Sequence, residues 1–195
     1  MRWEKVRMTV VAALVVLCLG LAACASAPLT QSKKVEDQAS VRDMANQTLA
    51  LLYKANPAAE GAIANSAGYA VFSDSGFKLL LMGGERGAGI AVNNATKQDT
   101  FMKMLELQPG LGVGAEKFRT VFIFDTFDTF SKFVTSGWEF GANAMAVAKT
   151  KTEGGALAGA VTVSEGVHMY QLDQAGAVVG VSLTGAKYYK DSKLN

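Results

Sequence analysis

The chain has 195 residues, with 19 Lys and Arg, 17 Asp and Glu, and a single histidine, His168. Its basic excess lies in the first seven residues, so residues 24–195 are formally neutral. This excludes the broad basic field of a nucleic-acid-binding protein. The two cysteines are Cys18 and Cys24, which leave no thiol further along the chain for a disulfide or a zinc site. We therefore expect no metal and no cofactor.

The first 23 residues have the three parts of a secretory signal. A positive start is followed by an almost unbroken apolar run from Met8 to Gly20, and residues 21–24 (Leu-Ala-Ala-Cys) resemble a bacterial lipobox. The resemblance implies cleavage before Cys24 and a diacylglycerol on its thiol. It also implies a third acyl chain, of the palmitate type, on the new amine.

Two other interpretations of this segment stay open. A retained transmembrane helix would be shorter than the roughly 20 residues that a bilayer span requires. An ordinary signal cut after Ala27 has the small-x-small form, but it would leave Pro28 as the first residue. If Cys24 is lipidated, the following Ala25, which is not an aspartate, implies the periplasmic face of the outer membrane.

The mature chain is predicted to divide into a lipidated tether, residues 24–34, and a single domain, residues 35–195. The domain begins with a helix over about 35–54, because apolar residues recur at three- and four-residue steps. Pro57 then breaks or restarts this helix. The predicted buried face consists of Val41, Met44, Ala45, Thr48, Leu49 and Leu52.

From Ala67 the chain changes to short strands separated by turn residues. Residues 93–97 are predicted to form a hairpin loop. Asp125 can cap a short helix beginning at Thr126, whose packing side would carry Phe127, Phe130 and Val134. Strands are predicted at 67–72, 77–82, 86–93, 100–107, 117–125, 143–150, 156–163, 167–172 and 178–184, with further hairpin connections at 151–155 and 173–176.

Short strands joined by tight turns, without a repeated alternation of strand and long helix, favour the α+β class. We expect a curved antiparallel sheet or partly closed barrel of short strands, covered by the N-terminal helix and the short mid-chain helix. Most aromatic residues between Phe118 and Phe140 should lie in the core. Trp138 follows Gly137 and is either a buried edge residue or exposed in the headgroup zone of a membrane.

Two runs of alternating glycines each predict a strip of bare backbone on one face of a strand. The first run is Gly87 and Gly89, and the second is Gly110, Gly112 and Gly114. Such glycines weaken a strand, so something needs the room. Either another part of the domain lies close against the strip, which is the favoured interpretation, or the strip lines a ligand groove. A phosphate loop is disfavoured because neither run ends in Gly-Lys-Ser/Thr.

Several motifs follow one another in a fixed order: residues 67–72 (AGYAVF), 87–89 (GAG), 110–114 (GLGVG), the strand 121–124 with its helix, Tyr170, and 175–185 (AGAVVGVSLTG). In this order they resemble the SYLF domain. The resemblance implies binding of membrane lipid, in eukaryotic members often a phosphoinositide, and in some members also of actin. We keep phospholipid association, because bacteria normally lack phosphoinositides and have no actin filaments outside the cytoplasm.

The expected site residues are Cys24 for lipidation, and Gly87, Gly89, Gly110, Gly112, Gly114 and Trp138 for contact with phospholipid. Two alternatives stay open. The domain could bind another envelope protein and use lipid only as a tether. A hydrolase could be built from Ser164, Glu165 and His168, which lie close in sequence, but there is no Gly-x-Ser-x-Gly elbow and His168 is better explained as a surface or hairpin-flank residue.

Overall fold

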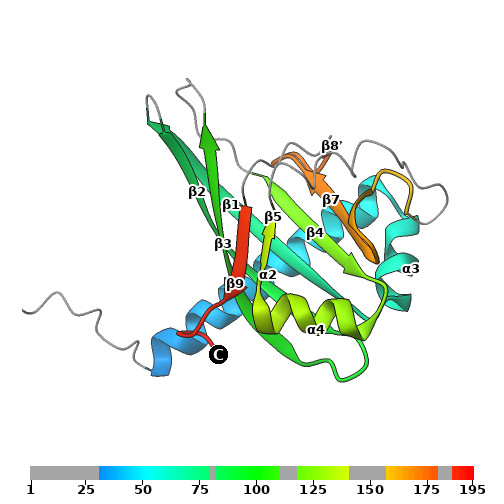
Figure 1. The fold of residues 1–195 in the computed structure, drawn as a ribbon, viewed down its shortest axis with the longest axis horizontal. Helices are drawn as coiled ribbons and strands as arrows, with labels where there is room; N and C mark the ends of the chain where they lie inside the picture. The colour runs from blue at the N-terminus through cyan, green and yellow to red at the C-terminus, as the bar shows by residue number, and fades with distance from the viewer. Residues whose placement is uncertain (1–30, 80–81, 110–117, 141–156, 180–185) are drawn as a thin grey trace, which may run out of the picture. The chain divides into compact units, whose positions relative to one another are not determined.

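The computed structural model describes residues 31–79, 82–109, 118–140, 157–179 and 186–195. These residues form an α+β fold in which a strongly curled antiparallel sheet makes a half-barrel (Figure 1). The predicted fold class is therefore confirmed. Cys24 and the cleavage sites considered above lie outside the described residues. The helices are α2 (Gln31–Ala55), α3 (Ala58–Asn65) and α4 (Phe127–Ser136).

The described strands pair in the order β5-β9-β3-β2-β1-β4-β7-β6, and β8 pairs with β7. Every one of these pairings is antiparallel. The strands are β1 (Gly68–Leu79), β2 (Met82–Asn93), β3 (Asp99–Pro109), β4 (Arg119–Phe124), β5 (Trp138–Phe140), β6 (Val161–Ser164), β7 (Val167–Leu172), β8 (Val178–Val179) and β9 (Ala186–Lys190).

The first strands are longer than predicted. The predicted strands 67–72 and 77–82 are largely one strand, β1, whose register with β2 runs unbroken from Gly68↔Asn93 to Leu79↔Met82. Polar and glycine residues at 73–76 are typical of a turn, but here they stay extended because both neighbouring segments pair. β5 and β9 were not predicted. β6 begins at Val161 rather than at residue 156, and the predicted strand 143–150, the connection 151–155 and residues 180–184 lie outside the described residues.

Helix α2 begins at Gln31, so the last four residues of the predicted tether are helical. Its buried residues are Val41, Ala45, Thr48, Leu49 and Leu52, as predicted, whereas Met44 is half-buried. Pro57 restarts the helix as α3, because a proline is tolerated where a helix begins. Within the described residues no helix is both long and apolar enough to cross a membrane.

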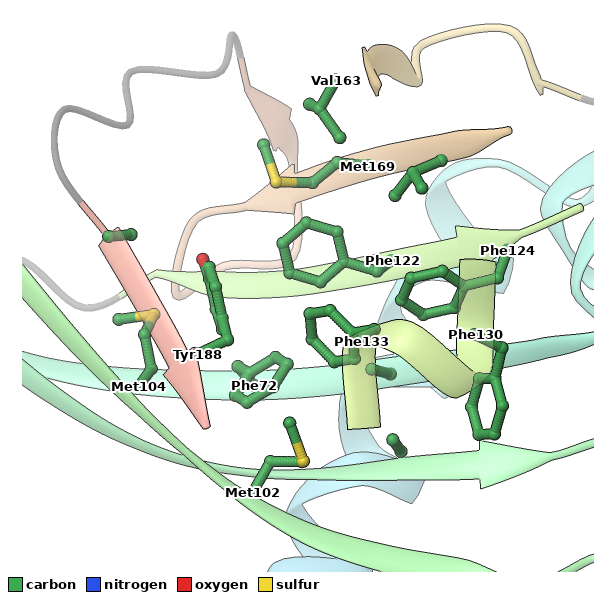
Figure 2. Close-up of a cluster of buried hydrophobic side chains, with 14 residues drawn as sticks. Phe72, Met102, Met104, Phe122, Phe124, Phe130, Phe133, Val163, Met169 and Tyr188 are labelled. Atoms are coloured by element: carbon green, nitrogen blue, oxygen red, sulfur yellow. The ribbon is translucent and has the colours of Figure 1, made fainter. Parts of the chain in front are cut away.

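The concave face of the sheet holds an aromatic core, against which α4 packs (Figures 1 and 2). The Phe122 ring lies 5.0 Å from that of Tyr188 and 5.7 Å from that of Phe133, centre to centre. Phe72 contacts the same three rings. All of these pairs except Phe122–Phe133 are edge to face, an arrangement that the charge distribution of the rings favours. The core is completed by Ala70, Ala91, Met102, Met104, Phe124, Phe130, Val163, Val167, Met169 and Ala186.

The convex face is covered by α2, which crosses behind the sheet in Figure 1. Residues directly opposite one another in a sheet share a face, and Val71 stands opposite both Ile90 and Val121. Polar groups are paired here. Arg119 donates to the Thr48 hydroxyl over 2.9 Å, and the Asn56 amide lies 3.5 Å from the Tyr170 hydroxyl. Burial raises the pKa of Tyr170, and the hydrogen bond with Asn56 opposes that rise.

Two predicted turns are confirmed. In the β2–β3 loop the Asn93 side chain accepts hydrogen bonds from the amides of Ala95 and Thr96. In the β7–β8 turn the Asp173 side chain accepts from the amide of Ala177, and Gly176 has a positive φ of 87°. Both turns are closed by the local side-chain acceptors that favour Asn and Asp at such positions.

Residues 191–195 connect the first turns of α2 to the sheet through hydrogen bonds. Gln38 donates to the Leu194 carbonyl over 2.7 Å, and Lys34 donates to the Asn195 carbonyl over 2.9 Å. The Asn195 side chain accepts from the amide of Phe101 on β3 and donates to its carbonyl. One asparagine side chain thus satisfies both backbone groups of a strand residue.

Candidate functional site

A cavity of about 410 Å³ opens between α4, the start of β5 and the β6–β7 turn. This volume falls in the lower part of the range for small-molecule sites. We call it the α4 pocket. It is lined by Phe124, Thr129, Lys132, Phe133, Ser136, Gly137, Trp138, Ser164, Glu165 and Val167.

The inner wall of the α4 pocket is apolar. Phe124, Phe133 and Val167 belong to the buried aromatic core. The half-buried Trp138 packs against that core, its ring 5.6 Å from Phe122 and 6.2 Å from Phe133, nearly perpendicular to each. Trp138 is thus a half-buried edge residue with one side on the core and another on the cavity, and its contact with a membrane stays a prediction.

Helix α4 is positioned by its two ends. Thr126 is the N-cap, and its hydroxyl accepts a hydrogen bond from the Thr129 amide over 3.3 Å. The predicted cap, Asp125, instead bonds to His168. At the other end Gly137 has a φ of 72°, and a Cβ there would lie 2.6 Å from the Tyr188 carbonyl oxygen. Only glycine makes this bend without strain, and the bend places Trp138 beside the helix.

The packing side of α4 also differs from the prediction. Phe130 and Phe133 are buried and Val134 is half-buried, but Phe127 is 62% exposed. Because α4 begins at Phe127, this residue faces solvent from the first turn instead of packing under the helix.

The mouth of the α4 pocket carries both signs of charge. Lys132 is 73% exposed and pairs with Asp128 over 2.7 Å, one turn earlier in α4. Glu165 is exposed on the β6–β7 turn. Hydroxyl groups of Thr129, Ser136 and Ser164 lie among the same lining residues. The pocket therefore combines an apolar interior with hydrogen-bonding groups and charges at its opening.

The first glycine strip faces the concave core. A Cβ at Gly87 would lie 3.0 Å from the Ser73 carbonyl oxygen and 3.3 Å from the Met104 Cβ. A Cβ at Gly89 would collide with the Phe72 ring and lie 2.6 Å from the Val71 carbonyl oxygen. Other parts of the same domain thus occupy this strip, and a lipid would have to displace Phe72 to reach it. Gly110, Gly112 and Gly114 lie outside the described residues.

The structure places the residues of the suggested hydrolase on two faces of the sheet, because Ser164 stands opposite Val167 and the next residue, His168, faces the other side. Ser164 and Glu165 line the α4 pocket, whereas His168 is only 5% exposed and is therefore a buried hairpin-flank residue, not a surface one. Its Nε2 lies 3.0 Å from an Asp125 carboxylate oxygen and its Nδ1 lies 3.1 Å from the Thr162 hydroxyl. The ring therefore joins β7 to the β4–α4 connection and to β6.

Sequence reasoning missed Lys132 as a site residue. The available signal was the helix period: Thr129, Lys132 and Ser136 recur at three- and four-residue steps beside Phe133, so they flank the buried side of α4. Their pairing with the β6–β7 turn needed the sheet order. Within the described part of the chain, no three His, Cys, Asp or Glu side chains come together as they would around a metal ion.

The described residues thus form a small α+β domain with an apolar cavity, charged at its mouth, on the concave side of its sheet. No family model matches the chain. It is similar to Beta cell expansion factor A of Aeromonas veronii, with 31% identity over 165 residues. The alignment covers 82% of this chain, and the chain spans only 59% of the relative's length. A bacterial homologue thus covers most of the chain.

Proposed function

We propose that this chain is a lipoprotein of the bacterial envelope, anchored through Cys24, whose SYLF-like domain binds membrane phospholipid and catalyses no reaction. The observation that carries the proposal is the α4 pocket, an apolar cavity with Trp138 in its wall and Lys132 at its mouth. Tryptophan and lysine are suited to this place, because each has an apolar body and a polar end. The match to a bacterial protein supports only the bacterial part of the proposal.

The anchor and the domain would have different roles. Two or three acyl chains at Cys24 hold a protein firmly to a bilayer, whereas one chain binds only reversibly. The domain therefore need not supply attachment, and its pocket can recognise a particular lipid. If Cys24 is lipidated as expected, the proposed place is the periplasmic face of the outer membrane.

Flotation of residues 26–195 with vesicles of phosphatidylethanolamine and phosphatidylglycerol tests the domain without its anchor. We expect the domain to float. Ser136→Phe places a ring at the mouth of the α4 pocket and should reduce the floated fraction several-fold. The matched control is Asn65→Phe, at an exposed position that lines a different cavity of about 410 Å³, beside α3. It should float like the unchanged domain.

Absence of flotation with any bacterial phospholipid would contradict the proposal. Crosslinking in cells followed by mass spectrometry would then decide for the other interpretation, in which the domain binds one envelope protein. Equal loss of flotation in Ser136→Phe and Asn65→Phe would show that the α4 pocket is not the lipid site.

A further inference from the structure

The size of the α4 pocket limits what it can hold. Its volume of about 410 Å³ lies near the lower bound for sites that enclose a small molecule. The buried side chains of Phe124, Phe133 and Val167 form the closed inner part, and the exposed Lys132 and Glu165 mark the opening. An apolar interior with charges at its mouth suits one acyl chain, which inserts its methyl end and leaves the headgroup at the opening. The second chain of a diacyl lipid would stay outside.

The charges at the opening discriminate between headgroups. Lys132 lies on α4 and Glu165 on the β6–β7 turn, so the two charges come from different elements. Asp128 pairs with Lys132, and both side chains of that pair are 73% exposed. Together these three groups give a net charge of about −1 at neutral pH. Such an opening offers a phosphate one cation, but it repels a headgroup that has no positive charge of its own.

We propose that the α4 pocket recognises an aminophospholipid, whose headgroup has both a phosphate and a primary ammonium, and takes up one of its acyl chains. This assignment rests on the proposed phospholipid binding and specifies its ligand. The phosphate oxygens accept hydrogen bonds from Lys132 Nζ and from the hydroxyl of Ser136. The ammonium donates to the Glu165 carboxylate. Charge-assisted hydrogen bonds of this kind are stronger than those between neutral groups.

Lys132 is available for this contact at little cost. Its pair with Asp128 is an exposed pair within one helix, and such pairs stabilise a protein only weakly. Among the described residues no cation is paired with Glu165. The phosphate and the ammonium can therefore bind Lys132 and Glu165 without breaking a strong contact within the protein.

The test uses the fluorescence of Trp138, which lines the pocket. The chain has two tryptophans, Trp3 and Trp138, so the full chain with Trp3→Phe reports from this site alone. It is placed in phosphatidylglycerol nanodiscs that contain a small fraction of one lipid with brominated acyl chains, since bromine quenches tryptophan on contact. The brominated lipid is phosphatidylethanolamine, phosphatidylglycerol or phosphatidylcholine.

We expect brominated phosphatidylethanolamine to quench Trp138 roughly two- to fivefold more than either other lipid, as suits charge pairs at a solvated opening. Glu165→Gln should remove this preference and leave the quenching by phosphatidylglycerol unchanged or stronger. The matched control is Glu60→Gln, an exposed position on α3, which should keep the preference. Circular dichroism shows whether each variant is folded.

Three results would overturn the assignment. Equal quenching by the three lipids would show that the pocket binds an acyl chain without discriminating between headgroups. The proposed phospholipid binding would then stand. Stronger quenching by phosphatidylglycerol shows an anion site. If no lipid quenches Trp138 while the domain still floats with vesicles, the lipid lies elsewhere. If flotation fails as well, the proposed function fails.

Discussion

Both faces of the sheet are buried beneath a helix, but the two faces are packed with different kinds of side chain. The concave face packs large rings beneath α4, where Phe72 meets Phe122 and Phe133 edge to face. The convex face packs aliphatic residues under α2 and includes paired polar groups, such as Arg119 with Thr48. Rigid rings meet only in certain geometries, and the α4 pocket lies at the margin of their cluster. The candidate site thus lies on the concave face, at the edge of the cluster of large rings.

The largest expected effect comes from breaking the aromatic cluster. Phe122 is fully buried and contacts the rings of Phe72, Phe124, Phe133, Trp138 and Tyr188. Phe122→Ala should lower the free energy of unfolding by about 3–5 kcal/mol, the range for a buried ring replaced by a cavity. Chemical denaturation measures it.

The matched change on the convex face is Ile90→Val, at a position that is only 2% exposed. It should cost about 0.5–1.5 kcal/mol, because one buried methylene group is lost. A smaller loss for Phe122→Ala than for Ile90→Val would contradict the account of the concave core.

The next largest loss of stability is expected from a side chain added at Gly89, in the glycine strip beside the aromatic rings. Gly89→Ala forces a methyl group against the Phe72 ring and the Val71 carbonyl oxygen. Overpacking of this kind should cost about 1–3 kcal/mol. Gly61→Ala in α3 is the control, because nothing lies within 4 Å of the added Cβ. It should stabilise the protein by about 0.5–1 kcal/mol, since alanine favours helix. Thermal unfolding of both variants, with midpoints shifted in opposite directions, is the expected observation.

The paired polar groups of the convex face allow a finer comparison. Thr48 is fully buried, accepts from Arg119 over 2.9 Å and donates to the Met44 carbonyl. Thr48→Val keeps the shape but removes the acceptor, so the free energy of unfolding should fall by about 1–3 kcal/mol. In the double mutant with Arg119→Met, the cost should be less than the sum of the two single costs. Simple additivity, measured by denaturation, would show that this hydrogen bond contributes nothing.

The smallest effect concerns alkaline pH. Burial raises the pKa values of Tyr53, Tyr69 and Tyr170 above the ordinary value of 10.0. The unfolded chain then releases these protons first, so their contribution to stability is complete below about pH 10 and is lost as the pH rises further. Unfolding measured between pH 8 and 11 should show a shallower fall for Tyr170→Phe. Tyr189→Phe, at an exposed position, should leave the slope unchanged, and a slope that is the same in all three proteins would be the contrary result.

Sequence patterns predicted the parts of the fold that depend on local spacing. The buried face of α2 follows the helix period. The position of α4 was predicted as well, although its cap is Thr126 instead of Asp125 and Phe127 is exposed instead of packed. The uninterrupted length of β1 and β2 was not predicted. Residues 73–76 and Gly83–Gly84 have turn composition, but pairing with the neighbouring strands holds them extended. The α4 pocket could not be predicted from the sequence for a related reason. Its walls come from residues 124–138 and 164–167, and only the order β4-β7-β6 brings these segments together.

The contacts of residues 191–195 with α2 determine how the domain would respond to a mechanical pull. Any tension that enters at Gln31 from the preceding chain meets Lys34 and Gln38, which are bonded to Asn195 and Leu194. From there it passes through the Asn195 side chain into the backbone of β3 at Phe101. The sheet therefore bears part of the force, and α2 need not unwind turn by turn from its N-terminal end.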